Sequence, residues 1–224
     1  MIIGISGKAR SGKDTFAEML ATELNKGAYP PYVMMAFANE LKMRCQAAFD
    51  LTWEQLWGDD KEKYDKRYPK HRGPLPYCAG NRDDGKGLEV LEERQHWTAR
   101  EIMQDYGAFY RTIDNEFWIK NLFKVAEDKE YTNVIVTDVR YINEADYILN
   151  NGGYVIRVER ESKDTVHNEE HPSEVELDDY KRFDYNVINN WTLKELQFGA
   201  TEVARFLRDS EKDFKKLKEI RING

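Results

Sequence analysis

Hydrophobic positions along the chain form five short apolar runs, separated by longer stretches in which apolar residues recur at helical spacing. The runs are Ile2 to Ser6, Tyr32 to Ala38, Asn133 to Thr137, Tyr154 to Val158 and Tyr185 to Ile188. Short runs that are apolar on both faces are typical of strands in a parallel sheet that helices cover on either side. The pattern therefore predicts a parallel five-stranded sheet.

Helices are predicted between these strands. Apolar residues follow helical spacing from Lys13 to about Asn25 and from Asn143 to Asn151. Two sequences, Thr98 to Glu101 and Thr192 to Glu195, have the Thr-x-x-Glu spacing of a capping box and predict the starts of two further helices. Strands and helices in alternation, joined by right-handed crossovers, predict an α/β sandwich of three layers.

Regular signals weaken in two segments. The region 58–96 is crowded with charged residues, glycine and proline, and we predict a mobile insertion there. The end of the chain, 209–224, is dense in charge and is predicted to be a frayed tail. The remaining pattern, over 1–208, predicts a single domain that contains the insertion.

Composition excludes several functional classes. The 224 residues carry 34 Lys and Arg against 41 Asp and Glu, a net charge of −7, which opposes binding to nucleic acid. Nucleic acid is therefore not expected as a partner. No apolar run approaches the roughly 18 to 20 residues that span a bilayer, so a membrane is not expected as a partner either. Two cysteines and four histidines support neither a disulfide scaffold nor a zinc site. We expect a cytoplasmic protein.

The segment between the first strand and the first helix carries the strongest chemical signal. Gly7 to Lys13 matches G-x-x-x-x-G-K, with Asp14 where Ser or Thr is usual and Thr15 one residue later. Glycines let the backbone N–H groups turn towards a phosphate, the helix N-terminus adds positive charge, and Lys13 bridges the outer phosphates. The motif predicts nucleotide binding on a fold like that of phosphate-loop NTPases. A glycine-rich turn without ligand is the alternative.

The residues after Lys13 are candidates for holding Mg²⁺, because hard cations prefer oxygen ligands. Either the Asp14 carboxylate or the Thr15 hydroxyl suits this role, and the sequence leaves both open.

A second candidate site follows the strand that ends near Asp138. A carboxylate at that position would lie beside a metal on the phosphate loop, and Arg140 follows two residues later. Phosphoryl transfer requires neutralised charge and reactants held in line, which makes Lys13, Asp138 and Arg140 the catalytic candidates. The alternative is a helix-capping Asp138 and a surface Arg140.

Several blocks together are similar to one family. Besides the phosphate loop, they are Phe37 to Lys42, Trp97 to Gly107, Phe117-Trp118, Thr137 to Arg140, Asn143-Glu144, Gly153 to Arg157 and His171 to Glu174. In these blocks the chain resembles the bacteriophage deoxynucleoside monophosphate kinases. The resemblance implies transfer of the γ-phosphoryl group of ATP to a deoxynucleoside monophosphate, with Mg²⁺, in the host cytoplasm if the origin is a phage.

The resemblance also implies roles for particular residues. ATP phosphates would contact the run from Gly12 to Thr15. Lys8 and Arg10 of the loop, and Arg160, are further candidates on the ATP side. Asp138 and Arg140 would lie between the two nucleotides. The monophosphate side would be lined by Arg100, Gln104, Gly107 and Trp118, with Glu144 as a further substrate contact. Glu101 stands where the family can have a second arginine, and the capping box accounts for it.

Three further residues have physical interpretations with open alternatives. Trp118 would stack on a base or pack in the core with Leu122. Arg111, one turn beyond Gly107, would reach the acceptor phosphate or pair with Asp114. Arg160 opens a polar stretch, 160–183, which we interpret as a lid that excludes water during transfer, because open kinases hydrolyse ATP. An exposed connection is the alternative.

Two other functions are alternatives to this kinase activity. Phosphomevalonate kinases share a similar loop and Asp-x-Arg strand but accept a smaller ester. A nucleotide-dependent switch would bind nucleotide without a small acceptor, although the Asn-Lys-x-Asp element of guanine-specific switches is absent from the sequence. The accepted bases, the preference between ribose and deoxyribose, and the oligomeric state, a homodimer included, are left open.

Overall fold

The structure is a computed structural model that describes residues 1–70, 96–160, 172–190 and 192–222, the last twelve of these as backbone only. The described chain divides into two compact units. The first comprises Met1–Asn39 and Asn115–Gly224, and the second comprises Glu40–Asp114. The predicted single domain therefore has two compact parts.

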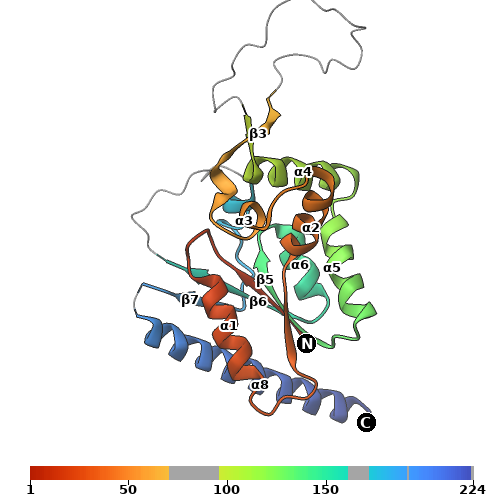
Figure 1. Cartoon of the computed structure of the whole chain (residues 1–224). Coiled ribbons are helices and arrows are strands. Elements are labelled where there is room, and N and C mark those ends of the chain that lie inside the picture. The colour runs from red at the N-terminus through yellow and green to blue at the C-terminus, as the bar shows by residue number, and fades with distance from the viewer. Residues whose placement is uncertain (71–95, 161–171, 191, 223–224) are drawn as a thin grey trace, which may run out of the picture. The chain divides into compact units, whose positions relative to one another are not determined.

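The first unit is built on the predicted parallel sheet (Figure 1). Its strands are β1 (Ile2–Ser6), β2 (Tyr32–Met35), β5 (Asn133–Val139), β6 (Tyr154–Glu159) and β7 (Tyr185–Ile188). Their order is β2-β5-β1-β6-β7, and every neighbouring pair is parallel. The predicted fold class, an α/β fold with a parallel five-stranded sheet, is confirmed.

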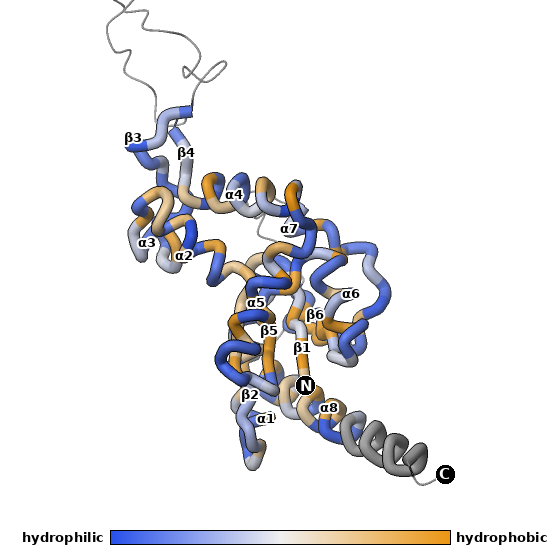
Figure 2. The backbone as a smooth tube through the Cα atoms, turned by 90° about the vertical axis from the view of Figure 1, so that its right-hand side faces the viewer, coloured by the Kyte–Doolittle hydropathy of each residue, from blue (hydrophilic) through white to orange (hydrophobic). Residues whose placement is uncertain are grey.

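Helices cover both faces of this sheet. Helices α1 (Lys13–Leu24) and α8 (Leu193–Ile222) share a buried apolar core with one face, to which β1 contributes Ile3 and Ile5. Helix α6 (Ile142–Asn150) covers the other face, where Ile148 lies against Gly4, and α5 (Phe117–Asp128) packs beside it. The tube in Figure 2 accordingly shows hydrophobic colour along β1, β5 and β6. Burial on both faces explains their continuous apolar sequence.

Gly4 lets the backbone of β1 approach α6. A Cβ at this position would lie 2.7 Å from Cδ1 of Ile148 and 2.9 Å from Cγ2 of Val139. We expect Gly4→Ala to lower the free energy of unfolding by about 1–3 kcal/mol, because the added methyl overpacks a buried contact. Urea denaturation followed by circular dichroism measures this loss.

Gly199 provides a matched control for this substitution. It lies in α8, and a Cβ there would meet Val187 at an ordinary 3.6 Å. Gly199→Ala should be neutral or stabilising, because alanine favours a helix interior over glycine. Equal losses in the two variants would contradict the overpacking argument.

The second unit has more regular structure than its sequence predicts. It contains most of α2 (Phe37–Phe49), followed by α3 (Trp53–Leu56), η1 (Asp60–Glu62), β3 (Tyr64–Pro69), β4 (His96–Thr98) and α4 (Ala99–Ile113). Strands β3 and β4 form an antiparallel ribbon. Residues 60–69, where the sequence gives no regular signal, thus form a 3-10 turn and a strand, whereas 71–95 lie outside the described residues and the mobile insertion over 58–96 stays a prediction.

Polar contacts hold this part of the second unit. Hydrogen bonds from Arg67 lower the pKa of the buried Asp65 to about 2, against the effect of burial, and a hydrogen bond from Gln55 adds to the lowering. The buried position of β3 is this carboxylate and not an apolar side chain, so the strand has no alternation of apolar and polar residues. The hydrophobic pattern alone consequently gives no sign of β3.

The end of the chain is also more regular than predicted. Helix α8 continues to Ile222, through the segment 209–222 that was expected to be a frayed tail. Four Lys, two Glu, one Leu and one Arg of this segment are strong helix formers, and the segment extends a helix that packing has already started.

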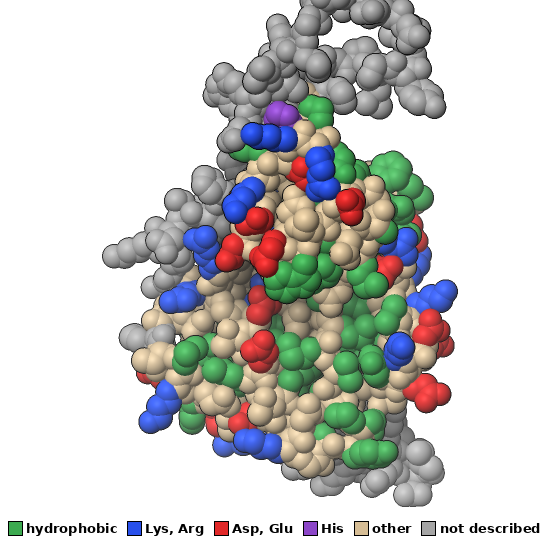
Figure 3. All heavy atoms as spheres, in the orientation of Figure 1, with side chains coloured by type: hydrophobic (Ala, Val, Ile, Leu, Met, Phe, Trp, Pro, Cys, Tyr) green, Lys and Arg blue, Asp and Glu red, His purple; other side chains and the backbone are tan. Residues whose placement is uncertain are grey.

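The described residues also show how charge is distributed on the surface and how long and apolar the helices are. The face in Figure 3 shows acidic and basic side chains interspersed, without a continuous basic area. Within the described residues, no helix is both long and apolar enough to cross a bilayer.

Candidate active site

The loop between β1 and α1 has the backbone of an anion-binding turn. Arg10 has a φ of 63° and Gly12 a φ of 85°, so two left-handed residues flank Ser11. When left-handed residues alternate with residues of negative φ, successive backbone N–H groups turn to the same side of the chain. Ser11 Oγ is buried and has no hydrogen-bond partner in the described structure. The loop therefore offers donors that suit a phosphate.

The two glycines of the motif are required by close packing. A Cβ on Gly7 would lie 2.6 Å from the carbonyl oxygen of Val158, and one on Gly12 would lie 2.3 Å from Nδ2 of Asn189. Asn189 Nδ2 also donates a 2.8 Å hydrogen bond to the Ser11 carbonyl. The buried Asn189, directly after β7, thus supports the loop from behind. Sequence reasoning missed this residue, because nothing in its neighbourhood marks it as functional.

We expect Asn189→Asp to weaken ATP binding about tenfold. The substitution faces the Ser11 carbonyl with a second acceptor, and an unpaired buried polar contact costs about 1–3 kcal/mol. Calorimetric titration with ATP measures the change. Asn151→Asp, in an exposed contact at the end of α6, is the control and should leave affinity unchanged. An Asn189→Asp affinity within twofold of wild type would exclude the supporting role.

Lys13 and Asp14 lie at the start of α1, directly after the loop. The Lys13 side chain is only 9% exposed, and its Nζ lies 3.3 Å from Oδ2 of the exposed Asp14. Lys8 and Arg10 are exposed on the loop itself. The predicted ATP-side residues of the loop are thus adjacent in the structure, whereas their contacts with nucleotide stay a prediction.

Asp138 anchors the start of α2. Its two carboxylate oxygens accept hydrogen bonds from the backbone N–H groups of Phe37 (2.7 Å) and Ala38 (2.9 Å). The helix therefore begins two residues earlier than the apolar run suggests, and the predicted strand to Ala38 is wrong beyond Met35. Asp138 thus caps a helix, as in the alternative interpretation, but the helix is α2, which lies about one hundred residues earlier in the chain.

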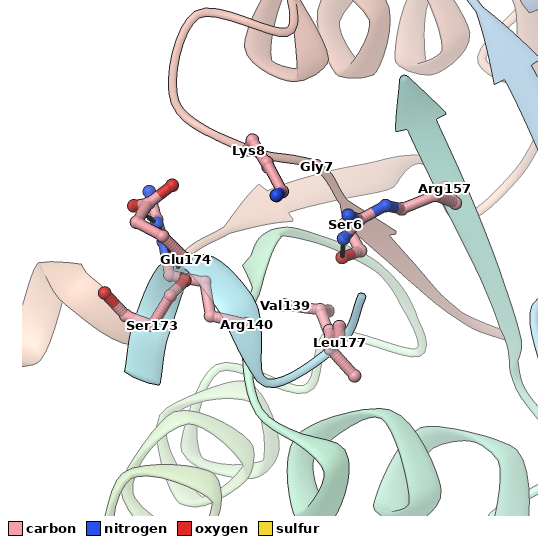
Figure 4. A pocket seen from close by; sticks show the side chains of 9 residues that line it. All are labelled: Ser6, Gly7, Lys8, Val139, Arg140, Arg157, Ser173, Glu174 and Leu177. Carbon is pink, nitrogen blue, oxygen red and sulfur yellow. Dashed lines mark hydrogen bonds and ion pairs between the residues drawn. The ribbon is translucent and has the colours of Figure 1, made fainter. Parts of the chain in front are cut away.

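Sheet register brings two arginines to the phosphate loop. Ser6, the last residue of β1, pairs with Val139 on β5 and with Arg157 on β6. Arg140 and Arg157 therefore stand on either side of the loop, at the edge where the parallel strands end. Nine residues line a small pocket here, and Figure 4 shows Lys8, Arg140 and Arg157 around it.

Arg140 is held by α7 (Pro172–Val175). Its Nη1 donates to the carbonyl of Ser173 at 3.2 Å and to the carboxylate of Glu174. The other carboxylate oxygen of Glu174 accepts a 2.9 Å hydrogen bond from the backbone N–H of Ala9, within the phosphate loop. Arg140 is thus not a free surface charge but part of a network that includes the loop.

Arg157 is the functional candidate that sequence reasoning left aside. It is 6% exposed, its Nη1 donates to Ser6 Oγ at 3.1 Å, and its Nη2 donates to Asp178 at 3.2 Å. Its buried Nε makes no hydrogen bond within the described residues. An arginine inside an apolar strand was a usable signal, because a buried charge requires a partner. Arg160, predicted instead, is exposed just beyond β6 and does not line the pocket.

Two other predicted substrate residues of the first unit are buried. Glu144 is 2% exposed and caps α6, where it accepts hydrogen bonds from the N–H groups of Arg140 (2.9 Å) and Tyr141 (3.2 Å). Trp118 is 3% exposed and packs edge-to-face against Phe117. These positions favour a supporting role for Glu144 and the core alternative for Trp118. Their contacts with substrate remain predictions.

The other predicted monophosphate residues lie on α4 in the second unit. Arg100 forms an ion pair with Glu62, Gln104 is half-buried, and Arg111 folds back over Gly107. A Cβ on Gly107 would lie 3.3 Å from Nη1 of Arg111 and 3.4 Å from Leu41. Glycine in the middle of this helix therefore makes room for the arginine.

Glu101 forms the predicted capping box at the start of α4. It accepts a 2.9 Å hydrogen bond from the Thr98 N–H, and its own N–H donates to Thr98 Oγ1. Burial would raise the pKa of Glu101, but hydrogen bonds from Lys70 and Thr98 lower it overall below its ordinary value. The prediction that capping occupies Glu101 is confirmed.

Asp14 and Thr15, the predicted oxygen ligands for a metal, directly follow the loop on the first turn of α1. Among the described residues, no group of three acidic, histidine or cysteine side chains forms a metal site. Mg²⁺ commonly uses one or two protein oxygens and takes its other ligands from phosphates and water. An exposed carboxylate and a hydroxyl on the first turn of α1 fit that kind of site.

Comparisons with known proteins agree with the blocks of similarity. A model of the deoxynucleotide monophosphate kinase family matches residues 81–199, more than half of the chain. A protein of Acanthamoeba polyphaga mimivirus, named "Putative deoxynucleotide monophosphate kinase", is 31% identical over 199 residues, which cover 87% of this chain and 91% of the viral protein.

Among solved structures, dephospho-CoA kinase from Campylobacter jejuni is similar with a TM-score of 0.48 and 12% identity, over 94% of this chain and 98% of that one. The family match and the viral relative confirm the predicted resemblance. On these two findings, the chain belongs to the deoxynucleotide monophosphate kinase family.

Proposed function

We propose that this protein transfers the γ-phosphoryl group of ATP to a deoxynucleoside 5′-monophosphate, which yields ADP and the deoxynucleoside diphosphate. The observation that carries the proposal is the meeting of the phosphate loop with Arg140 and Arg157 at one edge of the sheet. Family membership supports the class of acceptor.

Catalysis on this edge would rest on positioning and charge. The loop N–H groups and Lys13 would bind the phosphates of ATP, and Arg140 would neutralise charge that develops on the transferred group. Arg157 would add a second guanidinium from β6, on the other side of β1. No covalent intermediate and no strong base are needed for such a transfer.

Mg²⁺ would be held by Asp14 or Thr15 together with phosphate oxygens, and it would neutralise charge on the phosphate chain when bound. Asp138 would act through α2, since both of its carboxylate oxygens fix the start of that helix. Acceptor recognition would fall to Arg100, Gln104, Gly107 and Arg111 on α4, with a lid over 160–183. Residues 161–171 of that lid lie outside the described chain.

A coupled assay of ADP formation tests the proposal. The enzyme is mixed with ATP and Mg²⁺ and with each common deoxyribonucleoside and ribonucleoside monophosphate, or with no acceptor. We expect at least one deoxynucleoside monophosphate to raise ADP formation well above the rate without acceptor. Slow hydrolysis that no monophosphate accelerates would favour a nucleotide-dependent switch. Faster turnover with phosphomevalonate would favour the small-molecule kinase.

A further inference from the structure

The phosphate loop and Arg140 are already bridged by an internal anion. Glu174 accepts a 2.9 Å hydrogen bond from the Ala9 N–H with one carboxylate oxygen and binds Nη1 of Arg140 with the other. Its side chain is 11% exposed. A carboxylate that spans a loop amide and a guanidinium makes the same two contacts that two oxygens of a phosphate would make.

A second carboxylate from the same segment forms ion pairs with the other two cationic side chains of the pocket. Asp178 binds Lys8 Nζ at 2.7 Å and Arg157 Nη2 at 3.2 Å. Between them, Glu174 and Asp178 thus contact all three cationic side chains that line the pocket. Figure 4 shows these three side chains together with Glu174. The segment 172–178 brings both acids to the loop from more than 150 residues further along the chain.

We propose that Glu174 is an internal occupant of the phosphate site, which a nucleotide phosphate must displace. The inference rests on the proposed function, because it assumes that the Ala9 N–H and Arg140 bind phosphate. Both contacts use donors that a phosphate would need, and two anions cannot share them without like-charge repulsion. Empty protein with Glu174 seated is therefore closed to the phosphate chain.

This arrangement lowers apparent affinity in a measurable way. When only a fraction of the protein molecules can bind the ligand, the apparent Kd equals the intrinsic Kd divided by that fraction. Removal of the Glu174 charge raises that fraction. Because the neutral amide holds the Ala9 N–H and Arg140 less strongly than the carboxylate does, we expect Glu174→Gln to bind phosphate chains about five- to tenfold more tightly than wild type.

The test is calorimetric titration of the full chain without acceptor, using ATP, inorganic tripolyphosphate and adenosine as separate probes. We expect Glu174→Gln and Glu174→Ala to bind ATP and tripolyphosphate more tightly. Adenosine should bind as in wild type, because it lacks the competing charge. Glu202→Gln removes one negative charge on α8, in a pair with Arg205, and should leave all three affinities unchanged.

Asp178→Asn is a second variant that does not disturb Glu174 directly. It should tighten tripolyphosphate binding in the same direction but by less, because the Asp178 side chain is 37% exposed against 11% for Glu174. Thermal denaturation confirms that each variant is folded. If the Glu174 variants do not fold, the Asp178→Asn result decides.

Unchanged or weaker binding of tripolyphosphate in the folded variants would overturn the inference and make Glu174 a support of the site. This outcome is separate from failure of the proposed function, which is judged by ADP formation with an acceptor. Tighter binding without any transfer would uphold the internal occupant and reject the kinase. A wild-type chain and variants that all fail to bind ATP or tripolyphosphate would overturn both.

Discussion

Substitution of Lys13 by alanine is expected to lower kcat/KM for phosphoryl transfer by about a thousandfold or more. The Lys13 side chain is almost fully buried at the start of α1, beside the loop, so its ammonium charge is little screened by solvent. Loss of a single preorganised donor at a developing charge commonly costs about 10²- to 10³-fold, and here a full charge is removed as well. The coupled ADP assay with the preferred monophosphate measures the loss.

Two controls separate this effect from unfolding and from general loss of charge. The Lys13→Ala variant should keep the wild-type circular dichroism spectrum and a cooperative thermal transition. Lys26→Ala removes an exposed lysine that pairs with Glu23 at the end of α1, and it should leave turnover unchanged. Wild-type turnover in Lys13→Ala would remove this residue from the catalytic assignment.

The sheet could be predicted from sequence because its strands are buried on both faces. Ile2–Ser6 and Tyr185–Ile188 match the predicted runs to the residue. The same signal fails where tertiary contacts decide. Phe37 and Ala38 continue an apolar run, yet the carboxylate of Asp138, one hundred residues later, accepts their N–H groups and starts a helix. Local pattern has no access to such a partner.

The candidate site shows the same division between local and distant contacts. The motif from Gly7 to Lys13 predicts its own turn, because glycine spacing and a helix start are local features. Asn189 and Glu174 reach that turn through chain separations of 178 and 165 residues. Which carboxylate faces which arginine depends on sheet order, and no spacing in the sequence encodes the pairing of Ser6 with Arg157.

Substitution of Arg140 by alanine is expected to lower kcat/KM by about 10²- to 10³-fold, mainly through kcat. Arg140 follows β5 at the edge where the strands end, and its guanidinium reaches the loop through Glu174. A group that acts on charge developed during transfer affects kcat more than ATP affinity. Steady-state kinetics at saturating ATP, over a range of monophosphate concentrations, separates these two effects.

Removal of Arg140 should also change what Glu174 does, because the two are direct partners. In wild type, Glu174→Gln is expected to tighten tripolyphosphate binding, but in an Arg140→Ala background the same change should gain less, since Glu174 has already lost one of its two contacts. Arg205→Ala, in an exposed pair with Glu202 on α8, is the control and should alter neither kcat nor this coupling. An unchanged rate in Arg140→Ala, with additive effects in the double variant, would reduce Arg140 to a structural ion pair.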